Sequence, residues 1–172
     1  MKARNAQGFT LIELLIVVAI IGIIAAIAVP GLLRARISGN EASAIGSLRA
    51  ISSAQSTFSA SCGNGQYALT LDVLGSGPGG GSAFISPDLG VSATATKSGY
   101  NVSMSGAGGG SGTACNGSSS LSTGYHAWAD PVSTSTGTRY FGTNTTGTIW
   151  QGTASLNGMA DSATPSGANV IQ

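Results

Sequence analysis

The sequence predicts an α+β fold in which one long N-terminal helix packs on a C-terminal antiparallel β-sheet. Three observations support this fold class. The 20 residues from Leu14 to Leu33 include no charged side chain. The apolar pattern then continues at helical spacing as far as Ser61, and the rest of the chain carries short alternating segments between turn residues. At 172 residues the chain is long enough for one ordinary domain beside the apolar segment.

The apolar segment is long enough to cross a membrane. Its 20 uncharged residues would form a helix ~30 Å long, which is about the thickness of the hydrocarbon layer. Glu13 stands at the start of this segment, where a carboxylate without a partner costs roughly a few kcal/mol. Lys2 and Arg4 precede the segment and favour a cytoplasmic N-terminus. The segment is too long for a secretory signal peptide, and no small-residue cleavage site follows it.

The second half of the expected helix is amphipathic. Apolar residues recur at steps near three and four, with Arg36, Glu41 and Arg49 on other faces. The apolar residues of this stripe are Ile37, Ile45, Leu48, Ile51 and Phe58. We expect the whole helix to run from Thr10 to Ser61, because the breaker and turn residues that follow end it.

Two places weaken the expected helix. Gly22 is one, and the pair Pro30-Gly31 is the other. A proline removes one backbone hydrogen bond and clashes with the preceding turn, so a kink or local unwinding is expected at Pro30.

The remainder of the chain predicts a connecting loop followed by a sheet. Residues 66–98 read as the loop, with a short helix at 69–74 and a flexible stretch at 75–82. The alternating segments that predict strands are 100–105, 124–129, 138–143 and 148–151, with a hairpin loop at 143–147. One face of these strands can pack on the apolar stripe of the helix. Residues 154–172 predict no particular element.

Composition argues for an exported domain. Only 8% of residues are charged and the net charge is +1, so no basic patch supports nucleic-acid binding. Cys62 and Cys115 have no His or Cys neighbour at the spacing of a zinc site. In an oxidising compartment they would pair as a disulfide; the alternative is two unrelated buried thiols.

No set of residues indicates an enzyme, a cofactor or a metal site. His126 has no Ser or Cys partner in a recognisable motif, which favours an ordinary strand residue. The aspartates are dispersed, and no clustered Asp/Asn loop predicts a calcium site. They are Asp72, Asp88, Asp130 and Asp161.

The N-terminus resembles type IV pilins and the related pseudopilins of type II secretion. The resemblance rests on a short basic leader ending in Gly8, on the residues from Phe9 to Glu13, and on the apolar run through Pro30. It covers about the first thirty residues and implies the type IV pilin fold. The implied division is a leader (1–8), a transmembrane and filament-core helix (9–33), the amphipathic half of the helix (34–61) and a globular β head (62–172).

The resemblance also implies processing and assembly sites. A prepilin peptidase would cut after Gly8 and methylate the new amine of Phe9. In a filament the carboxylate of Glu13 would pair with the amine of Phe9, its own or a neighbour's, and would no longer be an unpaired charge. Such a pair penalises every slipped register of the apolar helices. We also assign Gly22 and Pro30 to assembly.

The expected function is that of a major-type pilin, a structural subunit of a type IV pilus that serves adhesion, surface motility or DNA uptake. Before assembly it would span the inner membrane once, in the lipid bilayer, and afterwards it would form an extracellular homopolymer. The implied partners are identical subunits, the prepilin peptidase, an inner-membrane assembly platform with a cytoplasmic ATPase, and an outer-membrane secretin. The alternatives are a major pseudopilin of type II secretion and a membrane-anchored binding protein that does not polymerise.

Overall fold

The computed structural model describes residues 9–171, and these divide into two compact units, one ending at Arg36 and one starting at Ile37. The predicted leader, with the cleavage residue Gly8, lies outside the described residues. We describe each unit by itself and call the second the C-terminal unit.

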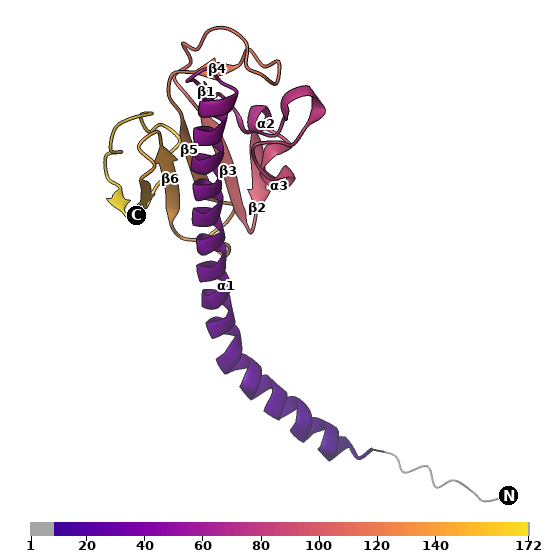
Figure 1. Cartoon of the computed structure of the whole chain (residues 1–172). Coiled ribbons are helices and arrows are strands. Elements are labelled where there is room, and N and C mark those ends of the chain that lie inside the picture. Colours follow the sequence, from indigo (N-terminus) through magenta and orange to yellow (C-terminus); the bar gives the residue numbers. More distant parts are fainter. Residues whose placement is uncertain (1–8, 172) are drawn as a thin grey trace, which may run out of the picture. The chain divides into compact units, whose positions relative to one another are not determined.

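The first helix confirms the sequence prediction closely. α1 spans Leu11–Ser61 and is continuous through Gly22 and Pro30 (Figure 1). Of the kink or local unwinding expected at Pro30, the unwinding is wrong: a proline removes its own hydrogen bond, whereas the flanking turns keep theirs. The kink stays a prediction. By length and composition, α1 is the one described helix that could cross a membrane.

The end of α1 is set by its last carbonyl groups and by the turn that follows. The N–H groups of Cys62 and Gly63 both donate to the carbonyl oxygen of Phe58, at 2.8 and 2.7 Å. Asn64 and Gly65 then adopt positive φ angles of 53° and 83°. This left-handed turn stops the helix, as the breaker residues predicted.

A six-stranded antiparallel sheet forms the centre of the C-terminal unit. The strands lie in the order β2-β3-β5-β6-β7-β8 (Figure 1). Their bounds are Thr94–Lys97 (β2), Tyr100–Ser105 (β3), His126–Pro131 (β5), Tyr140–Asn144 (β6), Ile149–Gly152 (β7) and Asn169–Val170 (β8). β2 and β3 are joined by Ser98 and Gly99, which both have positive φ, 48° and 73°, as a tight hairpin requires.

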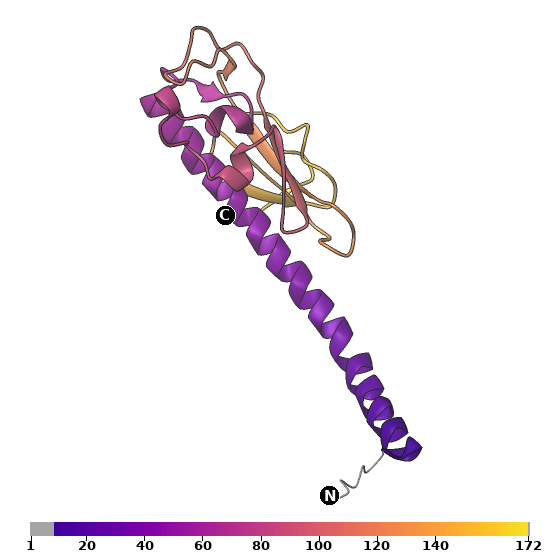
Figure 2. The same ribbon diagram turned by 90° about the vertical axis from the view of Figure 1, so that its right-hand side faces the viewer.

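One face of this sheet packs on the C-terminal half of α1, which runs along the sheet in Figure 2. Leu48, Ile51 and Phe58 of the predicted apolar stripe are fully buried there. Ile45 packs against the same core, whereas Ile37 is only half-buried. The sheet contributes its inward side chains: Tyr100, Val102, Met104, Ala127, Ala129, Phe141 and Ile149. The predicted packing of strands on the stripe is confirmed.

The loop between α1 and β3 contains more structure than the sequence predicted. It includes β1 (Tyr67–Ala68), α2 (Leu71–Leu74), η1 (Pro78–Gly80), α3 (Pro87–Gly90) and β2, and β1 pairs with β4 (Leu121–Ser122). Gln55 of α1 fixes β1 in place, because its amide donates to the carbonyl oxygen of Ala68 and accepts from the Ala68 N–H, at 2.7 and 2.9 Å. These elements are too short for a sequence period to reveal.

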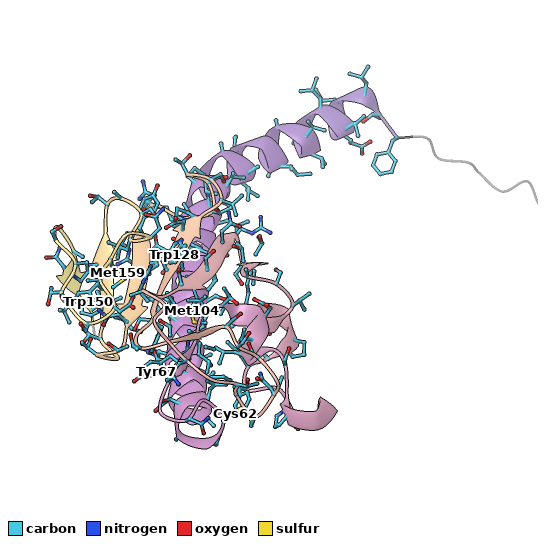
Figure 3. All side chains as sticks on the ribbon, turned by 90° about the horizontal axis from the view of Figure 1, so that it is seen from above. Cys62, Tyr67, Met104, Trp128, Trp150 and Met159 are labelled. Carbon is cyan, nitrogen blue, oxygen red and sulfur yellow. A yellow bond between two sulfur atoms is a disulfide. The ribbon has the colours of Figure 1, made fainter. Side chains whose placement is uncertain are left out.

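The outer face of the sheet is covered by the segment 153–168, which we call the C-terminal strap. Leu156 and Met159 of the strap form a second apolar cluster with Trp150 of β7, and Trp128 of β5 packs against it. Figure 3 shows Trp128, Trp150 and Met159 gathered together, apart from Cys62 and Tyr67. The sheet therefore has apolar contacts on both faces.

Candidate assembly site

The charged residue of the apolar segment, Glu13, is hydrogen-bonded to Thr10. The N–H and hydroxyl of Thr10 donate to Glu13 Oε2 at 2.9 and 2.6 Å, and the Glu13 N–H donates to Thr10 Oγ1 at 3.3 Å. This reciprocal arrangement is a capping box, and it satisfies donors that the first turn of α1 would otherwise leave free. From the sequence, Glu13 was expected to be an unpaired charge before assembly. The structure corrects this, because the carboxylate has a local partner.

The helix surface around Glu13 is apolar and uncovered within its own unit. Every large apolar side chain from Phe9 to Leu33 is at least 45% exposed. Covering one such side chain completely contributes about 1.5–3 kcal/mol, so this surface requires lipid or the helices of other subunits around it. The capping box thus lies at one end of an apolar helix that lacks a partner in the single chain.

Gly22 and Pro30 lie on this same apolar helix. A methyl group added at Gly22 would meet no atom within 4 Å, so packing within the subunit does not require a glycine there. Pro30 lies inside α1 and leaves one turn without its usual hydrogen bond. Their assignment to subunit contacts stays a prediction.

Glu41 was expected on a face away from the sheet, and this expectation is wrong. Its carboxylate is 6% exposed and contacts Arg139, whose Nη2 and Nε donate to Oε2 at 2.6 and 2.9 Å. The Thr138 N–H donates to Oε1 at 3.3 Å. Asn40 adds a bond from its amide to the carbonyl oxygen of Thr136 at 2.9 Å. Periodicity could not find this ion pair, because the partner is 98 residues away.

The environment of Glu41 keeps it ionised. Burial acts against the charged form, but the hydrogen bonds from Arg139 and from the Thr138 N–H outweigh it and hold the pKa of Glu41 below its usual value. Arg139 also donates through Nη1 to Gln151 Oε1 at 2.7 Å. This network ties α1 to β6 and β7, and it positions the helix on the sheet.

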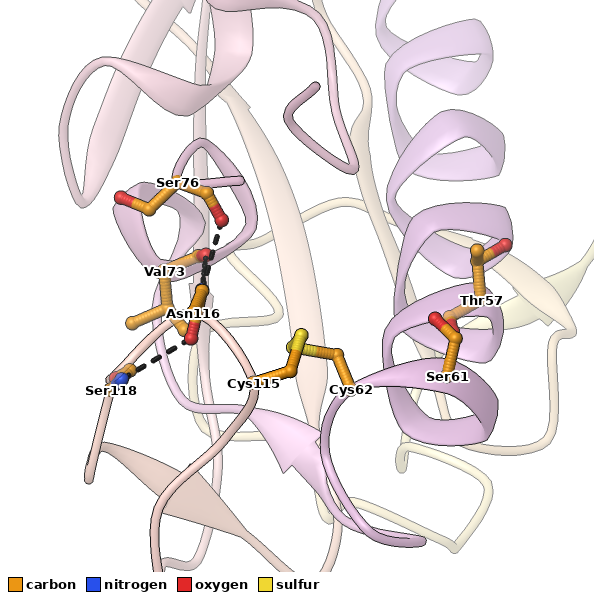
Figure 4. The surroundings of a disulfide bond; sticks show 8 residues. All are labelled: Thr57, Ser61, Cys62, Val73, Ser76, Cys115, Asn116 and Ser118. Atoms are coloured by element: carbon orange, nitrogen blue, oxygen red, sulfur yellow. Dashed lines mark hydrogen bonds between the residues drawn. A yellow bond between two sulfur atoms is a disulfide. The ribbon is translucent and has the colours of Figure 1, made fainter. Parts of the chain in front are cut away.

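The predicted disulfide between Cys62 and Cys115 is confirmed. It joins the end of α1 to the loop before β4, across a sequence separation of 53 (Figure 4). The Cys115 N–H also donates to the carbonyl oxygen of Cys62 at 3.0 Å. Beside the bridge, the amide of Asn116 donates to the carbonyl oxygens of Val73 and Ser76, both at 2.9 Å. The bridge and this amide fix the loop around α2.

Several other titratable residues of the C-terminal unit have local partners. His126 lies in β5 as expected, with Asp161 as a partner that the sequence did not suggest, at 2.7 Å. Asp88 pairs with Lys97 at 2.6 Å, and Asp130 accepts a hydrogen bond from Ser155 at 2.6 Å. Over residues 9–171, no three His, Cys, Asp or Glu side chains come together in a way that could hold a metal.

Comparison with known proteins identifies the class of the N-terminal segment. Residues 3–29 match the family model described as the prokaryotic N-terminal methylation motif. The chain is 66% identical over 38 residues to the type IV wide pilus major component PilA4 of Thermus thermophilus, covering 22% of this chain and 29% of PilA4. It is 51% identical over 55 residues to the type IV major pilin protein PilA of Myxococcus xanthus, covering 32% of this chain and 24% of PilA. No solved structure matches.

These matches confirm the predicted resemblance to type IV pilins. The two relatives match over less than a third of their own length, and the family model covers residues 3–29, which include most of the apolar segment. The rest of the chain agrees with the type IV pilin fold in architecture, since a long N-terminal helix packs on an antiparallel sheet.

Proposed function

We propose that this chain is a major-type pilin, a structural subunit that polymerises into a type IV pilus after cleavage after Gly8 and methylation of Phe9. The observation that carries the proposal is the apolar helix from Phe9 to Leu33, exposed along its length, with a single capped carboxylate near its start. An apolar surface of this size needs either lipid or neighbouring helices. The two matched relatives are both named as pilus components, which supports neighbouring helices as the environment of this surface.

In this proposal Glu13 changes partners on assembly. In the single subunit its carboxylate accepts hydrogen bonds from Thr10. Cleavage after Gly8 would create a positively charged amine on Phe9, one residue from Thr10. In a filament core the carboxylate then pairs with such an amine, its own or a neighbour's, and this pairing selects one register among apolar helices that could otherwise slide. The chain itself contributes no catalytic step.

Location and partners follow from this role. The subunit first spans the inner membrane once with its N-terminus in the cytoplasm, and it then joins an extracellular filament of identical subunits. The prepilin peptidase, an inner-membrane assembly platform with a cytoplasmic ATPase, and an outer-membrane secretin are the proposed machinery. Adhesion, surface motility and DNA uptake are the activities such a filament would serve.

A Glu13→Val variant tests the proposal. It should insert in the membrane and be processed like the wild type, whereas the yield of sheared filaments should fall at least about tenfold, because the charge pair that sets the register is absent. Immunoblots of membrane and sheared fractions measure both quantities. As a matched control, Arg49→Ala removes an exposed charge of the same helix outside the apolar segment and should leave assembly intact. A normal filament yield from Glu13→Val would refute the register argument.

Two other roles would give different results. A major pseudopilin of type II secretion would lose secretion of exported proteins on deletion, with no surface filament in the wild type. A membrane-anchored binding protein would retain Met1 and would not enter a sheared filament fraction.

A further inference from the structure

The C-terminal strap is fastened to the outer face of the sheet at two separate places. Around residues 160–163 it is fastened to β6, where the Asn144 amide donates to the carbonyl oxygens of Ala160 and Ala163 at 2.8 and 3.0 Å. Its first half is fastened to β5, where Ser155 donates to Asp130 at 2.6 Å and Nε2 of His126 lies 3.1 Å from the carbonyl oxygen of Asn157. The β5 anchor uses the titratable side chains of Asp130 and His126, whereas Asn144 does not titrate.

His126 faces a hydrogen-bond acceptor at each of its ring nitrogens. Nδ1 lies 2.7 Å from Asp161 Oδ1, and Nε2 lies 3.1 Å from the carbonyl oxygen of Asn157. A backbone carbonyl can only accept, and an ionised carboxylate can only accept. Both contacts are therefore hydrogen bonds only when both ring nitrogens carry a proton.

The proton count does not depend on where the extra proton lies. If Asp161 were the protonated partner, it would donate to Nδ1 while Nε2–H donated to Asn157, and the pair would still hold one proton more than a neutral histidine and a carboxylate. Asp161 Oδ2 also accepts a hydrogen bond from the Ala107 N–H at 2.8 Å, which favours the ionised carboxylate and a charged imidazole.

The surroundings of His126 also favour the charged ring. The ring stacks on Trp128 with 5.4 Å between centroids and 23° between planes, and an aromatic face stabilises a cation. Among residues 9–171, Asp161 is the charged group that contacts the ring. The cross-strand neighbours of His126 are the uncharged Ser105 and Asn144. Asp130, on the same face of β5, is bonded to Ser155 instead.

We propose that the proton held by His126 and Asp161 fastens the first half of the strap, so that residues 153–159 close on the sheet as the pH falls and open as it rises. Loss of the proton leaves Nδ1–H bonded to Asp161 and turns the lone pair of Nε2 towards the carbonyl oxygen of Asn157. That contact becomes repulsive, whereas the Asn144 anchor is unchanged. Opening uncovers the apolar surface formed by Trp128 and Trp150, which Leu156 and Met159 otherwise cover.

The direction follows from proton linkage. The closed strap binds more protons than the open strap, by at most one, because only the closed form adds the bond from Nε2–H to Asn157. Acid therefore favours closure, and the ratio of closed to open forms changes by at most about tenfold per pH unit. Burial also raises the pKa of Asp130. Protonation of Asp130 also favours the closed strap, so a test must separate the effect of Asp130 from that of the His126–Asp161 pair.

The first measurement is of the proton itself. The chain has a single histidine, so ¹⁵N-histidine labelling of the full chain in detergent micelles, without a histidine tag, gives signals from His126 alone. Spectra recorded across the pH range in which histidine side chains change charge should show protons on both ring nitrogens when the strap is closed and a proton on Nδ1 alone when it is open. A neutral Nδ1–H ring throughout this range would overturn the proposal, and no variant is needed for this result.

The second measurement is amide hydrogen exchange over the same pH range, followed by mass spectrometry. The exchange rates are corrected for the intrinsic rate at each pH, and peptides from Ile45–Phe58 serve as the internal reference. Exchange in residues 153–159 should rise by roughly tenfold or more, the effect of losing a hydrogen bond to a charged group, and residues 160–168 should change less. His126→Gln should abolish this pH response, whereas the control Asp130→Asn should retain it. Exchange that does not vary with pH in the wild type, or that varies equally in His126→Gln, would contradict the proposal.

Discussion

Replacing Glu41 by alanine should destabilise the C-terminal unit by about 2–3 kcal/mol. The substitution removes the acceptor for two hydrogen bonds from Arg139 and one from the Thr138 N–H. A hydrogen bond to a charged group contributes about 1.5–3 kcal/mol. We expect a total well below the sum of these values, because Arg139 is 47% exposed and regains water when its partner is lost. Glu41→Gln keeps one acceptor oxygen and should cost about half as much.

The assay is chemical denaturation of the full chain in detergent, followed by tryptophan fluorescence. Both tryptophans, Trp128 and Trp150, lie in the sheet, so the signal reports on the C-terminal unit. In thermal unfolding, the predicted loss of stability in Glu41→Ala corresponds to a melting midpoint roughly 5–10 °C lower than that of the wild type. Arg49→Ala, an exposed substitution on the same helix, is the matched control and should be neutral. A Glu41→Ala variant within about 0.5 kcal/mol of the wild type would refute the role given to this ion pair.

The pH dependence of this effect has a defined sign. The pKa of Glu41 is lower in the folded protein than its usual 4.5. Its charge therefore stabilises the fold above pH 4.5, and this contribution is lost as the pH falls through the folded-state pKa. The difference between wild type and Glu41→Gln should be constant near neutral pH and should shrink below about pH 4.5. A difference that grows in acid would contradict the assignment.

Two further changes test other parts of the C-terminal unit. Replacing Cys62 and Cys115 together by serine should lower the free energy of unfolding by about 4 kcal/mol, because a bridge over a separation of 53 residues restricts the unfolded chain. Denaturant titration measures this free energy, and an unchanged unfolding midpoint would contradict the prediction. Asp130→Asn should raise the melting midpoint by about 1–3 °C at neutral pH and change it little in acid. Burial raises the pKa of Asp130, so its ionised form destabilises the fold as the pH rises, and asparagine removes that charge. A lower midpoint at neutral pH would contradict this.

Long periodic segments were predictable from the sequence, and contacts between distant residues were not. The end of α1 at Ser61 and the strand Tyr100–Ser105 agree with the prediction, because many residues repeat one pattern in each. The strands predicted at 124–129 and 138–143 lie one to two residues further along the chain, since turn residues locate a strand end only approximately. The disulfide was foreseen from cysteine count and compartment.

The remaining features depend on partners far apart in the sequence. Glu41 has the pattern of an exposed helix residue, and only Arg139 explains its burial. The strap carries no periodic signal, yet it covers Trp128 and Trp150 and supplies Asp161 to His126. At the assembly site, the motif indicated that Glu13 matters. The bond to Thr10 was not predicted, although Thr10 and Glu13 have the sequence spacing of a capping box.

The N-terminus of this chain in material sheared from the cell surface tests the central claim most directly. Mass spectrometry of filaments visible by electron microscopy should find this chain as the main protein, starting at Phe9 and carrying one methyl group on its amine. Filaments that lack the chain, or a chain that still starts at Met1, would contradict the account.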